Sequence, residues 1–307
     1  MGGSGGSTGR NISPDKMIQL IRAQERKTKD RTFEVQASGL IARLLAGYNE
    51  RDVEGIGQHL AVVKRALASD VDGTVDLCFG GSVSKHTYVN GLSDIDALVV
   101  INQSDLIDHS PNEIREYFQS RLKQRLPDTE ISIGNLAVTV KFSDITIQLL
   151  PAVRIADRFR IPDFDGDTWS LIDPKGFSDH LTSVNQRLHG KLVPTIKLAK
   201  AVVSGLPESR QITGYHAESL AIEVFKKYDG EMTPKEMLKY FFTEGAKRVL
   251  GPIKDRTGQS IHVDDYLGNA GSLERRIVGD ALARVGRRMD NADGAQSVDQ
   301  WAKIFGE

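Results

Sequence analysis

The chain has 307 residues, of which 39% are hydrophobic and 26% are charged, and its formal net charge is −1 at pH 7. This composition predicts a folded globular protein, and it excludes a disordered chain or a protein drawn to nucleic acid by a strong overall positive charge. The single cysteine excludes an internal disulfide, and no apolar run reaches the roughly 20 residues that span a bilayer, so we expect a cytoplasmic protein without a membrane partner.

The N-terminal part is predicted to be helical. Its first nine residues, MGGSGGSTG, are typical of an artificial flexible linker and are left out of the fold. From Pro14 to about Asp70, apolar residues recur every three or four positions, as they do along one face of a helix. The polar run 48–52 interrupts this pattern, and Asp52 is suited to cap the start of a second helix.

A β-rich segment follows these helices. The predicted strands cover residues 75–79, 96–101, 131–133, 137–142 and 145–150. The run 96–101 is almost wholly apolar, which favours a central position in a sheet. The last two strands form a predicted hairpin that ends at Pro151. A helix is expected over 111–122, and the polar stretch 158–177 is expected to consist of turns.

Helical periodicity returns from about residue 182. The predicted helices cover residues 188–203, 214–228, 234–250 and 273–290. The order of helices, mixed β-rich core and helices predicts an α+β fold. We expect a core with N-terminal helices over residues 10–180, a C-terminal helical lobe over 181–307, and a cleft between them.

The stretch between the first two strands carries the residues best suited to chemistry. Gly81 and Ser82 follow a strand end, where glycine lets the backbone approach a ligand and exposed amides can hold phosphate oxygens. Asp94 and Asp96 enter the next strand, and because side chains alternate along a strand, both carboxylates point to the same side. Each feature alone is more typical of an ordinary turn or a solvated strand end. Their order and spacing together favour a binding site.

Asp94 and Asp96 are predicted to bind a metal ion. Two neighbouring carboxylates repel each other unless a cation offsets their charge. Oxygen ligands combined with phosphates suit Mg²⁺, with Mn²⁺ as the alternative. Two such ions about 4 Å apart would activate an attacking hydroxyl and stabilise a leaving pyrophosphate.

The stretch 79–101 resembles the GS-loop and DxD signature of the DNA polymerase β-like nucleotidyltransferase superfamily. More narrowly, the chain resembles the bacterial CD-NTases, relatives of cyclic GMP–AMP synthase that make oligonucleotide second messengers in anti-phage defence. Further segments that resemble this family are 137–142, 147–152, 192–201, 214–220, 251–255 and 263–267. The resemblance covers roughly residues 30–290 and implies a polymerase β-like core with a C-terminal helical lobe and an active site between them.

The resemblance also implies roles for individual residues. The Gly81–Ser82 turn would hold the donor triphosphate. Lys200, in preference to Lys197, would contact phosphate, and Tyr215 would stack on a base. Lys85, between the glycines and the aspartates, is a further candidate for phosphate binding. Each lysine is otherwise typical of a solvated surface, and a tyrosine in such a helix is otherwise typical of packing.

One position departs from the family pattern. The third carboxylate of the family belongs on the strand before Pro151, where this sequence has Gln148. In the family, the third carboxylate helps to activate the acceptor hydroxyl and is the residue nearest to a general base. Glutamine is neutral, so the substitution leaves this function unassigned. Three alternatives stay open. The two aspartates and the substrate phosphates suffice; Asp144 or an acid of the 163–167 cluster substitutes; or the protein binds nucleotide and turns it over poorly.

The sequence therefore predicts an enzyme that joins nucleoside triphosphates, ATP among them, into a cyclic or linear oligonucleotide and releases pyrophosphate. The resemblance implies a downstream effector protein as a partner, and the net charge of −1 argues against a stable complex with nucleic acid. Two alternatives remain. One is a nucleotidyltransferase that modifies tRNA or protein, as a CCA-adding enzyme or a toxin does. The other is a catalytically weak nucleotide-binding relative, which Gln148 supports.

Overall fold

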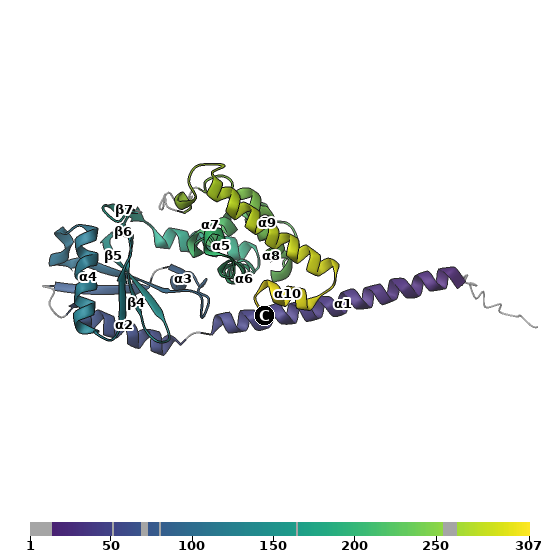
Figure 1. Cartoon of the computed structure of the whole chain (residues 1–307), viewed down its shortest axis with the longest axis horizontal. Helices are drawn as coiled ribbons and strands as arrows, with labels where there is room; N and C mark the ends of the chain where they lie inside the picture. Colours follow the sequence, from purple (N-terminus) through teal and green to yellow (C-terminus); the bar gives the residue numbers. More distant parts are fainter. Residues whose placement is uncertain (1–13, 51, 69–72, 80, 164, 254–262) are drawn as a thin grey trace, which may run out of the picture.

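The computed structural model describes residues 14–50, 52–68, 73–79, 81–163, 165–253 and 263–307. Residues 1–9, predicted to be a linker, and residues 254–255 of one family-like segment lie outside the described residues. A sheet with its own helices forms one end of the molecule, and a helical lobe lies beside it (Figure 1). The α+β fold class predicted from the sequence is confirmed.

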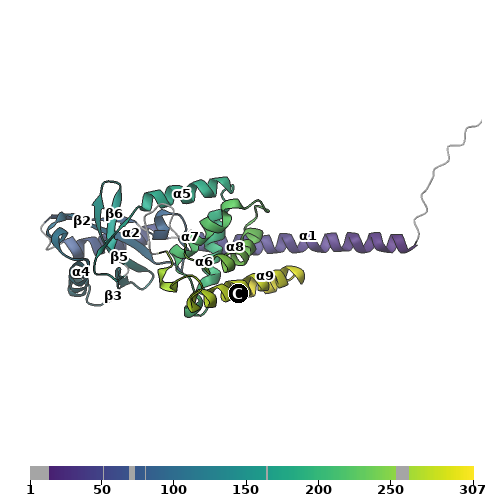
Figure 2. The ribbon, with the colours of Figure 1, turned by 90° about the horizontal axis from the view of Figure 1, so that it is seen from above.

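The two N-terminal helices are α1 (Pro14–Asn49) and α2 (Val53–Ala68). Asp52 caps α2, because its Oδ1 accepts the backbone N–H of Gly55 at 2.8 Å. The first part of α1 extends away from the rest of the molecule (Figures 1 and 2). The later part packs on the helical lobe through Phe33, Ala37, Leu40, Ile41 and Leu44.

The described strands form one seven-stranded sheet. They are β1 (Gly73–Phe79), β2 (Ile95–Ser104), β3 (Glu130–Ile133), β4 (Val138–Lys141), β5 (Thr146–Ile155), β6 (Arg158–Pro162) and β7 (Trp169–Ile172). Their order is β1-β2-β5-β4-β3, and the β6–β7 hairpin continues from β5. Strands β2 and β5 run parallel, and the other pairs are antiparallel. The apolar strand β2 lies inside the sheet, as its sequence predicted.

Helices α2 and α4 (Pro111–Arg125) cover one face of the sheet with a continuous apolar core. This core takes alternate residues of β2, such as Ile95 and Ala97. Because side chains alternate along a strand, Asp96 projects to the opposite face. The helical lobe lies toward that side of the sheet. The alternation of side chains along β2 therefore turns Asp96 toward the lobe and away from the apolar core.

Two predictions for this region are wrong. Strand β5 does not end at Pro151 but continues to Ile155. On its outer side β5 pairs with β4 only as far as Leu149 and with β6 only from Val153, so the proline lies where no neighbouring strand needs its missing N–H. The stretch 158–177 contains the β6–β7 hairpin instead of turns alone, because alternate apolar residues of β6 pack on the sheet.

Six helices form the C-terminal part of the described chain. They are α5 (Pro174–Arg187), α6 (Leu192–Ser204), α7 (Gly214–Val224), α8 (Pro234–Arg248), α9 (Leu273–Gly294) and α10 (Val298–Ile304). Their core includes the fully buried Trp301. Helix α5 runs across the predicted boundary near residue 180 and packs on the lobe. The division into two domains at that position stays a prediction. None of the helices in the described part of the chain has the length and apolar character needed to cross a bilayer.

Candidate functional site

A cavity of about 700 Å³ opens between the sheet and the helical lobe. Its sheet side comes from α3 (Gly81–Ser84), β2 and β5, and its lobe side comes from α5, α6 and α7. The cavity wall contains every residue that the sequence placed in the site: Gly81, Ser82, Lys85, Asp94, Asp96, Gln148, Lys200 and Tyr215. The fold thus brings together candidates that lie more than a hundred positions apart in the chain.

The turn into α3 packs directly against a carboxylate. Gly81 has a φ of +50°, and a Cβ atom at this position would lie only 1.6 Å from Oδ2 of Asp96. Glycine alone satisfies both the backbone conformation and the contact. Ser82 is buried, and its carbonyl accepts the N–H groups of Thr87 at 2.9 Å and Tyr88 at 3.1 Å. These bonds fix the turn in place beside Asp96.

Asp94, Asp96 and Gln148 form a polar group on the sheet side of the cavity. Asp96 lies opposite Gln148 in the parallel pairing of β2 with β5, and Gln148 Nε2 donates to Oδ2 of Asp94 at 2.7 Å. Burial raises the pKa of Asp96 to about 6. The charges of Lys85 and Lys200 act to lower this pKa, and the charges of Glu218 and Asp94 act to raise it.

The chemistry of this polar group is that of two carboxylates and one amide. No cluster of three or more His, Cys, Asp or Glu side chains in the described residues could hold a metal ion. Two carboxylates beside an open cavity still suit Mg²⁺, because this ion usually takes its remaining ligands from phosphates and water. The donor set therefore fits a cation that arrives with a phosphate-bearing ligand.

Glu218, on α7, is a site residue that the sequence analysis did not assign. Its side chain is 1% exposed and accepts hydrogen bonds from Lys85, from Lys200 at 2.7 Å and from the hydroxyl of Thr87. Burial acts to raise the pKa of Glu218, but the two ammonium groups outweigh it and lower the pKa to about 2. The sequence signal was its place in the family-like segment 214–220, which carried no role for this residue. One carboxylate thus holds two lysines from separate parts of the chain at the cavity wall.

Two aromatic rings surround the ammonium group of Lys85. Its Nζ lies 4.9 Å from the ring centroids of both Phe177 and Tyr215. The two rings lie 4.9 Å apart at an interplanar angle of 48°. Tyr215 therefore packs against Phe177 and Lys85 as well as lining the cavity, and Lys85 gains a cation–π contact that holds it there.

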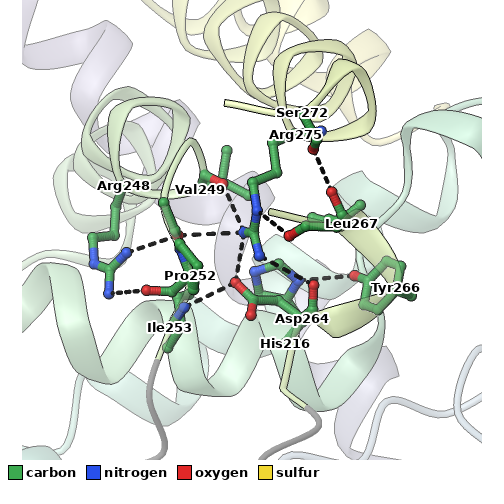
Figure 3. A network of polar contacts seen from close by, with 12 residues as sticks. His216, Arg248, Val249, Pro252, Ile253, Asp264, Tyr266, Leu267, Ser272 and Arg275 are labelled. Atoms are coloured by element: carbon green, nitrogen blue, oxygen red, sulfur yellow. Dashed lines mark hydrogen bonds and ion pairs between the residues drawn. The ribbon is translucent and has the colours of Figure 1, made fainter. Parts of the chain in front are cut away.

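A buried network fixes the segment 263–268 to the lobe (Figure 3). Arg275 has no exposed surface and donates to the carboxylate of Asp264 at 2.8 Å and to the carbonyl of Gly268 at 2.9 Å. The same carboxylate accepts the backbone N–H of Ile253 at 3.0 Å. Several charge-assisted bonds on one guanidinium hold this segment in a single position.

Tyr266 extends from this network to the cavity wall (Figure 3). Its hydroxyl accepts the backbone N–H of Thr213 at 3.1 Å and lies 2.8 Å from Nδ1 of His216. Burial lowers the pKa of His216 to about 4, so the ring is neutral near pH 7 and shares one hydrogen bond with the tyrosine hydroxyl through Nδ1. The sequence analysis named the family-like segment 263–267 but assigned Tyr266 no role, because this 3-10 turn (Asp265–Leu267) is too short for a periodic pattern.

Three other candidates from the sequence do not reach the cavity wall. Lys197 is buried and donates to Asn49, which leaves Lys200 as the lysine of α6 in the site. Asp144 contacts His59 at 3.0 Å instead of lying beside Gln148. In the acidic loop 163–167, the carboxylate of Asp163 accepts hydrogen bonds from its own loop. Neither alternative acid therefore replaces the missing third carboxylate in this structure.

Comparisons with known proteins agree with the fold. Residues 47–185 match the family model described as "Second Messenger Oligonucleotide or Dinucleotide Synthetase domain". This segment contains α2, all seven strands and both aspartates. A comparison with curated protein sequences finds no match.

Solved structures share the fold over most of the chain. The CdnC:HORMA-deltaN complex of E. coli MS115-1 matches with a TM-score of 0.62 and 18% identity, over 87% of this chain and 96% of that one. The 3′-deoxy GTP-bound form of E. coli DncV matches with a TM-score of 0.63 and 12% identity, over 96% and 92%. The CD-NTase CdnG of Bradyrhizobium diazoefficiens in complex with GTP matches with a TM-score of 0.61 and 12% identity, over 88% and 99%.

Proposed function

We propose that this chain belongs to the Second Messenger Oligonucleotide or Dinucleotide Synthetase family of nucleotidyltransferases, and that it joins nucleoside triphosphates into a cyclic or linear oligonucleotide in a metal-dependent reaction that releases pyrophosphate. The observation that carries the proposal is the convergence of Gly81, Asp94, Asp96 and Lys200 on one cavity. From the family resemblance, we further propose that the product signals in anti-phage defence through a downstream effector protein.

The triphosphate is assigned to the junction of α3 with the lobe. Ser82 and the backbone amides of α3 provide donors for phosphate oxygens. Lys85 and Lys200 carry two positive charges against the single negative charge of Glu218, so a net positive charge remains for an anionic ligand. The ammonium groups are also held in place before binding, which lowers the ordering cost when the phosphates arrive.

Asp94 and Asp96 are assigned to Mg²⁺, with Mn²⁺ as the alternative, because their carboxylates lie beside this phosphate site. When bound, the ion supplies charge neutralisation on the phosphates and a lower pKa for the attacking hydroxyl. The contact of Asp96 with Gly81 orients one carboxylate, and the bond from Gln148 orients the other.

The primary experiment incubates the purified protein with labelled NTPs and dNTPs and Mg²⁺, and identifies products by mass spectrometry. We expect an oligonucleotide product from the wild type and roughly a thousandfold less from Asp96→Asn, since a lost carboxylate ligand removes several kcal/mol of charge stabilisation. Asp144→Asn is the matched control, because it removes an acid of the same core outside the cavity wall. Equal product from Asp96→Asn and the wild type would refute the assignment.

Gln148 supports a second candidate, a nucleotide-binding protein with weak turnover. Its amide donates to Asp94 and supplies no third carboxylate to the acceptor side of the site. We expect Gln148→Asp to raise the rate by roughly 10–100-fold, since a positioned base contributes a factor of this size or more. The variant should also gain more thermal stability from Mg²⁺ than the wild type does, because three close carboxylates repel one another without a cation. Tight metal-dependent NTP binding without product from either protein would favour the second candidate.

Transfer of label to added tRNA or protein is the third outcome of the same experiment. It would assign the chain to the nucleotidyltransferases that modify macromolecules and would refute a small-molecule product.

A further inference from the structure

Gln211 lies in the lobe wall of the cavity, in the loop that joins α6 to α7. Its side-chain Nε2 donates to the backbone carbonyls of Leu206 at 2.7 Å and Ser204 at 3.2 Å. Ser204 is the last residue of α6, where the carbonyls of a helix have no partner within the helix. The amide nitrogen of Gln211 therefore caps the end of α6.

These two contacts fix the orientation of the side-chain amide of Gln211. A carbonyl oxygen only accepts hydrogen bonds, so a reversed amide would bring three acceptor oxygens together with no proton between them. The nitrogen must consequently face Leu206 and Ser204. The remaining polar atom, Oε1, receives no hydrogen bond from the part of the chain that the structure describes. Gln211 lines the cavity, so we assign this acceptor, with no donor left on the amide, as the group that meets a ligand there.

Ser204, also in the cavity wall, has the same polarity. Its hydroxyl proton is donated to the carbonyl of Ala201 at 2.8 Å, which leaves only lone pairs on Oγ for another partner. Two neighbouring side chains of the lobe wall thus present acceptors. A ligand group that also accepts hydrogen bonds would face unfavourable contacts here, whereas an N–H group would be bound.

On the basis of the proposed function, we infer that Gln211 is a specificity-determining residue that selects nucleotides whose base carries an exocyclic amino group. Adenine, guanine and cytosine carry such a group, while hypoxanthine and uracil carry a carbonyl oxygen or a hydrogen at the same positions and a ring N–H at the neighbouring one. Tighter binding of ITP or UTP would therefore assign the acceptor to that ring N–H and overturn the inference. The aromatic rings of Tyr215 and Tyr266 lie in the same wall and can stack on the base while its edge meets Gln211. In the proposed function, Lys85 and Lys200 hold the triphosphate end of the ligand.

The test measures equilibrium binding, so it does not depend on turnover. Dissociation constants are measured with Mg²⁺ for three pairs that share the triphosphate and differ at the base edge: ATP against ITP, GTP against ITP, and CTP against UTP. We expect the amino-bearing member of at least one pair to bind about tenfold more tightly, the factor that a well-placed base contact supplies. The pair that responds identifies the base.

Gln211→Lys separates the two roles of this residue. An ammonium group can still donate to the carbonyls of Leu206 and Ser204, so the cap is kept, but the acceptor is lost. The added charge acts on both members of a pair through the same triphosphate, so the ratio within a pair isolates the effect at the base edge. We expect the ratio to fall to about one, with an unchanged melting temperature. Ser204→Ala, which removes the second acceptor, should lower the ratio less.

Each outcome bears on a distinct claim. Ratios within twofold for all three wild-type pairs, or a wild-type ratio that survives Gln211→Lys, would overturn the role of Gln211 and leave the proposed function intact. Absence of binding for every nucleotide would overturn the proposed function as well.

Discussion

Removal of the carboxylate of Glu218 should both destabilise the protein and loosen the proposed phosphate site. Glu218→Gln keeps the size of the side chain but leaves Lys85 and Lys200 against a neutral amide. The difference between the ordinary pKa of 4.5 and the folded value of about 2 corresponds to about 3 kcal/mol in favour of the ionised folded form. Breaking a buried ion pair by removing one partner costs a similar amount, about 3–5 kcal/mol.

The sign of the pH dependence follows from the lowered pKa of Glu218. A carboxyl group whose folded pKa is depressed contributes its full stability above its unfolded pKa of 4.5 and loses it as the pH falls toward about 2. The difference in unfolding free energy between the wild type and Glu218→Gln should therefore be constant from pH 7 to pH 5 and shrink below pH 4.5.

The assay is urea unfolding at several pH values, combined with NTP titration at pH 7. Glu223→Gln is the matched control on the same helix, because its carboxylate pairs with Lys226 and is 15% exposed. We expect about 1 kcal/mol or less for this control. NTP affinity should change only in Glu218→Gln, since only its lysines line the cavity. A loss below 1 kcal/mol for Glu218→Gln, with unchanged NTP affinity, would refute the reasoning.

The remaining predictions concern the turn beside Asp96 and the buried network of the lobe. Gly81→Ala should lower nucleotide transfer more than about 100-fold, because the added Cβ overlaps the Asp96 carboxylate. The control is Gly91→Ala, at a φ of +75° with open space around it, which should leave transfer unchanged and lower the unfolding free energy by roughly 1 kcal/mol. Because burial lowers the pKa of His216 from 6.5 to about 4, the unfolded chain takes up a proton that the folded chain refuses, so about 3 kcal/mol of stability should be lost as the pH falls from 6.5 to 4. In His216→Gln, urea unfolding should show that this part of the pH dependence has disappeared, and an unchanged slope would contradict the assignment. Arg275→Lys should lower the unfolding free energy by about 3 kcal/mol, because an ammonium group cannot reproduce the forked contacts to the buried carboxylate and the carbonyls. A melting temperature within about 2 °C of the wild-type value, which corresponds to a loss of about 1 kcal/mol at most, would argue against this.

Several parts of the fold and the site could be predicted because they depend on local pattern. The apolar run of β2, the interrupted periodicity that separates α1 from α2, and the spacing of Asp94 and Asp96 are properties of neighbouring residues. The same holds for the family-like segments 79–101, 137–142 and 147–152, which lie within the residues 47–185 that match the family model. These features need no knowledge of which elements pack together.

The parts that could not be predicted depend on contacts between distant residues. Glu218 stands in the family-like segment 214–220, but its role exists only because the fold brings Lys85 and Lys200 to it. Pro151 was expected to end a strand, and only the arrangement of β4 and β6 on the outer side of β5 makes its missing N–H harmless.

By itself, the sequence determined the chemistry available to this protein: a glycine turn, two aspartates on one side of a strand, and an amide where a third carboxylate is expected. Alternation and backbone freedom are local, so these properties are fixed wherever the segments lie. Only the tertiary structure decided which lysine joins them, which carboxylate holds that lysine, and which carbonyls accept the amide protons of Gln211. Hydrogen bonds and charge pairing across the cavity depend on distances in space, and those distances are set by the packing of the whole chain.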